Sequence, residues 1–117
     1  MTTHRPFVTG SHAYGIPEAK SDVDLVCLVT ENDLKRLQKQ ADSQSVWNEK
    51  GKRDNYNATK LRSHSLHFGK VNLICCLDVE VYLLWRDGTL KLKKQRPVSH
   101  TFACKFFDKL RAKKGWK

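Results

Sequence analysis

The stretch TGSHAYGIPEAKSDVDLVCLV, residues 9–29, joins a glycine-serine bend to two aspartates that lead into an apolar run. The run Val23–Val29 is rich in leucine and β-branched residues, which predicts a buried strand. Gly15 and Pro17 argue against a long helix before this strand and predict a helical turn followed by a loop. A short apolar segment, Pro6–Thr9, predicts another strand that ends at the glycine. Two strands joined by a short turn are therefore expected in this part of the chain.

Three later segments have the pattern of amphipathic helices. Thr30 and Asp33 resemble a capping box, and apolar residues at spacings of three and four follow them. Asp78 and Ser99 are suitable N-caps for two further helices. The helices are expected over Glu31–Asp42, over Val79–Asp87 with a stop at Gly88, and over His100–Lys114, with Phe102, Phe106, Phe107 and Leu110 as the inner stripe of the last.

The segment HSLHFGKVNLICCL, residues 64–77, predicts a β-hairpin that turns at Gly69-Lys70. A two-residue turn in this place pairs His67 with Asn72. Residues 43–62 are polar and have no clear period, which predicts a long connection. Together the patterns predict a single α/β (α+β) domain of all 117 residues, with a small mixed β-sheet flanked by helices.

Composition limits the class of protein. The chain has 117 residues and 39% apolar residues, which is enough for one small core. It has no run of the roughly 18 to 20 apolar residues that a membrane span needs, and residues 1–10 lack the order of a secretory signal. We therefore expect a cytoplasmic protein with no membrane partner. The four cysteines have neither disulfide-framework nor zinc spacing, so reduced thiols are expected: Cys27, Cys75, Cys76 and Cys104.

The charge is uneven along the chain. Residues 1–50 carry six Lys/Arg and seven Asp/Glu, whereas residues 51–117 carry sixteen and five, so the net charges are −1 and +11 and their sum is +10. The basic half favours a polyanionic partner such as nucleic acid or an acidic protein. The segment Lys91–Arg96 and the C-terminal helix, about residues 100–114, are the expected contact surfaces, although a solvated loop explains the first equally well.

The two aspartates have the spacing of a metal clamp. Asp22 and Asp24 are one residue apart, so on an extended backbone both carboxylates project from the same face, about 7 Å apart at the backbone. Such carboxylates, together with substrate phosphates, bind Mg²⁺ or Mn²⁺. Upstream, Gly10 lets backbone N–H groups approach a phosphate, and the Ser11 hydroxyl adds a donor. The motif therefore predicts a site for a metal-bound nucleoside triphosphate.

At these residues the chain resembles the nucleotidyltransferase superfamily that includes DNA polymerase beta. The form GSHAYG followed by SDVDL is most similar to the small nucleotidyltransferases of bacteria and bacteriophages. The resemblance implies that Asp22 and Asp24 bind metal and that Gly10 and Ser11 position the triphosphate. It implies transfer of a nucleoside monophosphate from the triphosphate to a hydroxyl of nucleic acid, protein or a small molecule. A phage origin would place the protein in the host cytoplasm.

One departure from this family bears on catalysis. Its active members carry a third carboxylate on a later strand, as a metal ligand and a base, and here Asn72 occupies that position. An amide cannot accept a proton and is a weaker ligand for Mg²⁺. Asp54, Asp78 and Glu80 are the alternatives for the missing carboxylate. Asn72 also supports a second hypothesis, in which a catalytically degenerate protein of the same fold regulates a host protein or RNA. A third hypothesis is a basic nucleic-acid-binding module in which the motif is accidental.

Histidines and tryptophans add weaker indications. His12 follows Ser11 and could contact phosphate, although a solvent-facing side chain is the simpler expectation. His67 lies across from Asn72 in the expected hairpin, whereas His64 points to the opposite face, which argues against a zinc pair. Base stacking is a weak hypothesis for each tryptophan: Trp85 is expected in the core, Trp47 at the end of its helix, and Trp116 in a lysine-rich tail.

Overall fold

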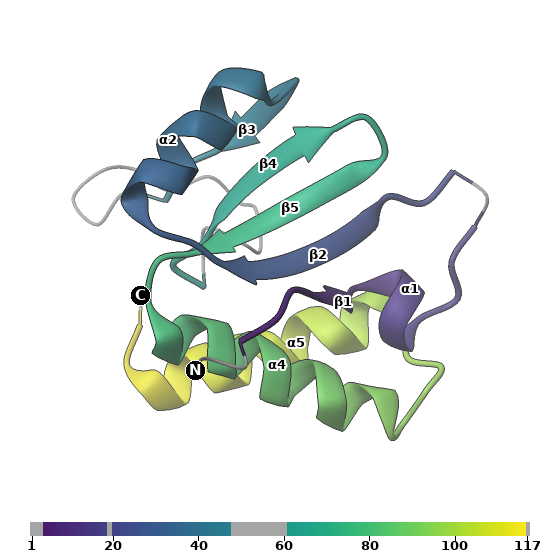
Figure 1. Cartoon of the computed structure of the whole chain (residues 1–117). Helices are drawn as coiled ribbons and strands as arrows, with labels where there is room; N and C mark the ends of the chain where they lie inside the picture. The colour runs from purple at the N-terminus through teal and green to yellow at the C-terminus, as the bar shows by residue number, and fades with distance from the viewer. Residues whose placement is uncertain (1–3, 19, 48–60, 117) are drawn as a thin grey trace.

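Five strands form one mixed sheet, and four helices pack against it in the part of the chain that the structure describes. The computed structural model describes residues 4–18, 20–47 and 61–116 (Figure 1). The fold is an α+β domain, as the sequence predicts. Its elements are β1 (Phe7–Thr9), α1 (Ser11–Tyr14), β2 (Val23–Leu28), α2 (Glu31–Gln40), β3 (Ser43–Ser45), β4 (His64–Phe68), β5 (Val71–Cys76), α4 (Val79–Lys93) and α5 (His100–Lys114).

The sheet has the order β1-β2-β5-β4-β3, with the parallel pair β2 and β5 at its centre. The remaining pairs are antiparallel. In the hairpin of β4 and β5, His67 pairs with Asn72, which confirms the predicted register. Gly69 has a φ of 59°, which a glycine tolerates at the first position of a two-residue turn. Alternation then places Asp24 and Asn72 side by side on the same face of the sheet.

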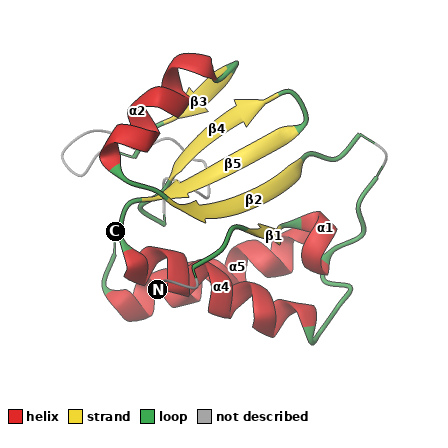
Figure 2. Ribbon diagram, in the orientation of Figure 1, coloured by secondary structure: helices red, strands yellow, loops and turns green. Residues whose placement is uncertain are grey.

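Each face of the sheet is covered by helices (Figure 2). Helix α2 packs on one face through Leu34, next to the buried Cys27 and Leu66. Helices α4 and α5 cover the other face, where Trp85 and Phe107 meet Val26 and Ile74 in the larger core. The face that carries Asp24 and Asn72 is therefore the one covered by α4 and α5.

Strand β3 is absent from the sequence prediction, which treats residues 43–62 as a connection. The structure pairs β3 with the edge of β4, Ser43 opposite His67. Asp42 fixes this pairing, because its N–H donates to the His67 carbonyl (2.8 Å) and its carboxylate accepts from the Gly69 N–H (2.7 Å). A short polar edge strand leaves no period in the sequence. Residues 48–60, Asp54 among them, lie outside the described residues.

Helix α4 is longer than predicted, because Gly88 does not end it. The helix continues to Lys93, and Gly88 is buried within it. A Cβ on Gly88 would lie 2.6 Å from Phe107 Cε1 of α5. The glycine therefore allows two helices to approach closely, and it is not a C-cap. Lys91–Lys93 accordingly belong to the last turn of α4, whereas Lys94–Arg96 follow it.

Helix α5 has the predicted bounds. Its N-cap Ser99 accepts a hydrogen bond from the Phe102 N–H (3.1 Å), and Gly115 ends it with a φ of 73°. The predicted inner stripe is wrong at one position. Phe102 is 45% exposed, and Ala103 is buried beside Phe107 instead. Packing against α4 at Gly88 rotates the inner face of α5 towards Ala103.

Aromatic side chains anchor the segment before β4. Trp85 is in the core as predicted, and its Nε1–H donates to Ser63 Oγ (2.9 Å). Trp47 follows β3 and packs edge-on against His64. The Arg62 guanidinium lies 4.8 Å from the centre of the Trp116 ring, which attaches the end of the chain to this segment. Within the described ranges, no helix combines the length and the apolar character needed to cross a membrane.

The close approach of α4 and α5 gives a prediction for Gly88→Ala. In an ordinary helix interior this change stabilises by about 1 kcal/mol, because glycine is a poor helix former. Here the added methyl meets Phe107, so we expect a net destabilisation of about 1–3 kcal/mol in urea denaturation. The same change in a Phe107→Leu background should cost less. A Gly88→Ala protein more stable than the wild type would contradict this packing.

Candidate functional site

The bend at Gly10 and the carboxylate of Asp24 are in direct contact. Thr9, the last residue of β1, pairs with Asp24 of β2, so the chain turns at Gly10 next to this side chain. Gly10 has φ 71° and ψ −157°, a region that is essentially restricted to glycine. A Cβ on Gly10 would lie 2.2 Å from Asp24 Oδ2. Both the backbone conformation and the available space therefore require glycine here.

Asp24 is a half-buried carboxylate under opposing influences. Burial raises the pKa of the Asp24 carboxyl, and the charge of Asp22 raises it further. A hydrogen bond from Asn72, together with His12 and His67, lowers the same pKa. Asp22 is exposed and directly precedes β2. The structure thus brings Asp22 close enough to act on Asp24 electrostatically. A cation bound here would offset both the desolvation of the Asp24 carboxylate and its repulsion by Asp22.

Asn72 lies next to Asp24 on the neighbouring strand β5. It is 4% exposed, and its Nδ2–H donates to Asp24 Oδ1 (3.0 Å). Its Oδ1 accepts a hydrogen bond from the Ser65 hydroxyl of β4. Because both ends of the amide are used, the orientation of Asn72 is fixed. It holds Asp24 in place and offers no site for a proton.

A cleft of about 640 Å³ opens in front of these residues. One end is lined by Gly10, Ser11, Asp24 and Asn72, and the other by the first turns of α5 and the segment before them. The Val98 N–H donates to the Tyr14 carbonyl (2.8 Å), which attaches that segment to α1. Burial raises the pKa of Tyr14 to about 12, so its phenol is neutral near pH 7. The cleft therefore has a carboxylate at one end, and its other end combines apolar side chains such as Val98 and Phe107 with His100 and Cys104.

The wall formed by α5 is the part of the site that sequence reasoning misses. His100 and Cys104 line the cleft from α5, with Cys104 Sγ 3.4 Å from His100 Nε2. They are about 80 residues from Asp24 in sequence, and no local pattern connects them with it. The N-cap at Ser99 predicts only that a helix begins there. Tertiary packing of α5 on α4 brings these side chains to the site.

The two histidines of the hairpin lie on opposite faces of the sheet, as predicted, whereas His12 is partly buried and does not face solvent freely. His12 lies beside the loop that leads to Asp22, with its Nε2 3.3 Å from the Ser21 carbonyl oxygen. His67 is on the face of the sheet that carries Asn72. His64 lies on the opposite face of the sheet, where it pairs with Cys75. Its Nδ1 accepts a hydrogen bond from the Trp47 N–H (3.1 Å). A His64–His67 zinc pair is therefore excluded by the register.

Two of the proposed substitutes for the third carboxylate, Asp78 and Glu80, are described by the structure, and they lie at the start of α4 and not beside Asp24. Asp78 follows the far end of β5 and caps α4 by accepting from the Glu80 N–H (2.8 Å). Six residues separate Asp78 from Asn72, or about 20 Å along a strand. Among the described residues, no three His, Cys, Asp or Glu side chains come together to hold a metal ion. Of the acidic side chains that the structure describes, Asp22 is the one that acts electrostatically on Asp24.

Comparisons of the chain with protein-family models, with curated proteins and with solved structures found no match. Function therefore has to be inferred from the chemistry of the cleft.

The contact at Gly10 gives a prediction that has an internal control. Gly10→Ala introduces both backbone strain and a clash with Asp24, so we expect a loss of about 2–4 kcal/mol in the free energy of unfolding. Gly69 also has a positive φ, but no atom lies within 4 Å of its Cβ position. Gly69→Ala should therefore cost only about 1 kcal/mol. Equal losses in the two variants, measured by urea denaturation, would show that Asp24 does not crowd the bend.

Proposed function

We propose that this cleft binds a nucleoside triphosphate with Mg²⁺ or Mn²⁺, and that the protein transfers the nucleoside monophosphate to a hydroxyl group. The observation that supports this most is the contact between the Asp24 carboxylate and the Gly10 bend. It brings a metal-ligating oxygen next to a backbone that has no side chain in the way of a phosphate. The cleft volume, about 640 Å³, is within the range of pockets for ligands of this size.

The carboxylates suit a hard divalent cation. Asp24 is half-buried, and Asp22 adds a second negative charge that raises its pKa. A cation held by both oxygens would remove the cost of keeping Asp24 charged. Mg²⁺ is usually bound by one or two carboxylates, with water and substrate phosphates as the other ligands, so a pair is sufficient. When bound, such an ion neutralises charge on the phosphates and assists departure of the leaving group.

The residues of the bend have a separate task. Without a Cβ at Gly10, the phosphates can approach the backbone, and the Ser11 hydroxyl can donate to a phosphate oxygen.

In the transfer, the acceptor oxygen forms a bond to the α-phosphorus while the bond to the bridging oxygen breaks and pyrophosphate leaves. The proton of the acceptor hydroxyl must go elsewhere than Asn72, whose amide is already bonded to Asp24 and Ser65. His12 and His67, which both act on Asp24 electrostatically, are the imidazoles available for it.

The state of Asn72 also favours a second candidate function. Its amide stabilises Asp24 in the absence of any ligand, and it replaces a proton acceptor with a donor. A protein with this arrangement could retain metal-dependent nucleotide binding after losing catalysis. In that case the nucleotide would act as a regulatory ligand, and the protein would control a host protein or RNA, as a phage-encoded regulator does. Turnover separates this candidate from the first one.

The experiment measures pyrophosphate release with each nucleoside triphosphate, Mg²⁺ or Mn²⁺, and cell lysate as a source of acceptors. An α-phosphate label shows whether RNA, protein or a small molecule is modified. We expect release that depends on the metal and falls at least about a hundredfold in Asp24→Asn. Asp87→Asn, which removes an exposed carboxylate on α4, is the matched control and should keep full activity. Release that is unaffected by Asp24→Asn would contradict the proposal.

Asn72→Asp distinguishes the two candidate functions. The change restores a carboxylate next to Asp24, and the Ser65 hydroxyl can still donate to it. If the protein is a poor enzyme that lacks a base, turnover should rise by about a hundredfold, in the range of general base catalysis. Asn72→Ala is the control, because it also removes the hydrogen bond to Asp24 but adds no base. Nucleotide-induced thermal stabilisation of the wild type, without turnover in either protein, would instead support the regulatory function.

A further inference from the structure

The outer face of α5 carries a straight row of lysines. Lys105, Lys109 and Lys113 follow one another at intervals of four residues, so they lie on one side of the helix, about 6 Å apart along its axis. All three are exposed, whereas Ala103 and Phe107 are buried on the opposite side. The row is therefore a regular line of positive charge on the surface.

An exposed aromatic ring extends this row towards the cleft. Phe102 precedes Lys105 by three residues, which places it on the same side of α5. It is 45% exposed, although its sequence pattern predicts a core position. Proteins that bind single-stranded nucleic acid combine surface aromatic rings with lysines, since bases stack on the rings and phosphates contact the ammonium groups.

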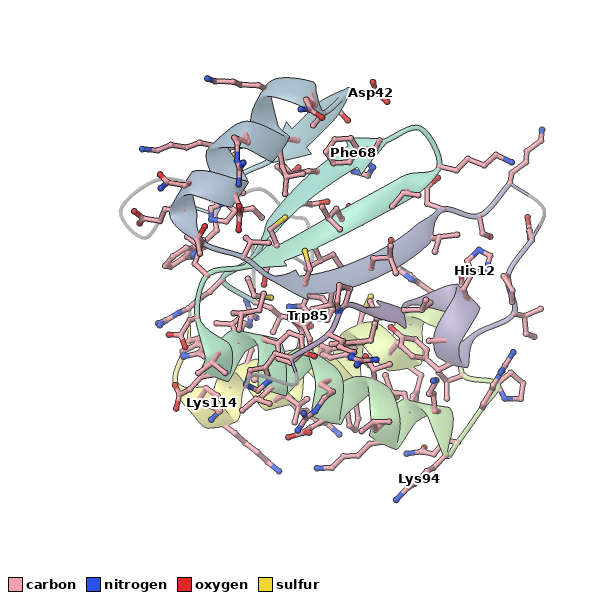
Figure 3. All side chains as sticks on the ribbon, viewed as in Figure 1. His12, Asp42, Phe68, Trp85, Lys94 and Lys114 are labelled. Carbon is pink, nitrogen blue, oxygen red and sulfur yellow. The ribbon has the colours of Figure 1, made fainter. Side chains whose placement is uncertain are left out.

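The row begins in the same turns of α5 whose opposite side lines the cleft. His100 and Ala103, in the first turns of α5, line the cleft that contains Asp24. Figure 1 shows α5 starting near α1 and running to the opposite side of the domain, where Lys114 is labelled in Figure 3. The helix has 15 residues and is about 22 Å long. A strand of several nucleotides lying on its outer face would have one end beside the first turn of α5, and that end would pass around the start of the helix to enter the cleft.

We propose that the outer face of α5 binds single-stranded nucleic acid, with phosphates on Lys105, Lys109 and Lys113 and a base on Phe102. The end of this strand reaches the cleft, and its terminal hydroxyl is the acceptor; this last step rests on the proposed function, whereas the binding does not. The exposed basic residues of the segment before α5 add to the positive potential near the cleft: Lys91, Lys93, Lys94 and Arg96. An acidic protein would satisfy the lysines but gives no reason for the exposed ring in line with them.

The test is fluorescence anisotropy of a labelled single-stranded RNA oligonucleotide of mixed sequence, titrated at several salt concentrations. It is done in EDTA without nucleotide, so the result does not depend on turnover in the cleft. The variant Lys105→Gln/Lys109→Gln is compared with Lys35→Gln/Lys39→Gln. The second pair has the same spacing and is exposed on α2, on the other face of the sheet.

Removal of the α5 pair should weaken binding by about tenfold or more and reduce the slope of log affinity against log salt by about 1.4. Removal of the α2 pair should change affinity by less than about twofold. Phe102→Ala should weaken binding, while Leu90→Ala, which truncates another exposed apolar side chain, should not. The thermal midpoint of each variant, expected to match the wild type, shows that folding is retained.

Each of the following results would overturn the assignment: no binding by the wild type, equal effects of the two lysine pairs, or tighter binding of duplex that is indifferent to Phe102→Ala. If acidic polypeptide such as polyglutamate competes as well as the oligonucleotide, the face binds acidic protein and the assignment is wrong. Binding that follows the prediction while pyrophosphate release is absent would support the surface and reject only the transfer step.

Discussion

The arrangement of the cleft depends on the contact between the Gly10 bend and the Asp24 carboxylate. Antiparallel pairing of β1 with β2 brings the bend to Asp24, and a glycine is needed because a Cβ would lie 2.2 Å from Oδ2. Parallel pairing of β2 with β5 adds Asn72 on the other side of the same carboxylate. Three strands thus bring polar groups together around one carboxylate, next to the apolar core at Val26 and Ile74.

This point is costly for the folded chain without a ligand. Burial and the charge of Asp22 both disfavour the charged form of Asp24, and the hydrogen bond from Asn72 offsets only part of this effect. Residues that are held in unfavourable electrostatic surroundings are common at functional sites, because a ligand can supply what the protein lacks. A cation bound to phosphates would supply it here.

Sequence patterns predicted the local part of this arrangement and missed the tertiary part. The strand after Asp22, the hairpin register at Asn72 and both ends of α5 follow from alternation, turn residues and caps. The prediction that α4 ends at Gly88 is wrong because the sequence does not distinguish a glycine that ends a helix from one that lets a second helix pack closely. The short edge strand Ser43–Ser45 depends on pairing with β4 and has no pattern of its own. The α5 wall of the cleft arises from helix packing over a long sequence separation, so no spacing rule reveals it.

The most direct measurement is a crystal structure of the protein with Mg²⁺ and a nucleoside triphosphate analogue that cannot be cleaved at the α-phosphate. The account predicts an ion between the carboxylates of Asp22 and Asp24, with phosphate oxygens against the Gly10-Ser11 backbone and the base at the α5 end of the cleft. An analogue bound elsewhere, or a cleft that stays empty at saturating concentrations of both, would contradict it.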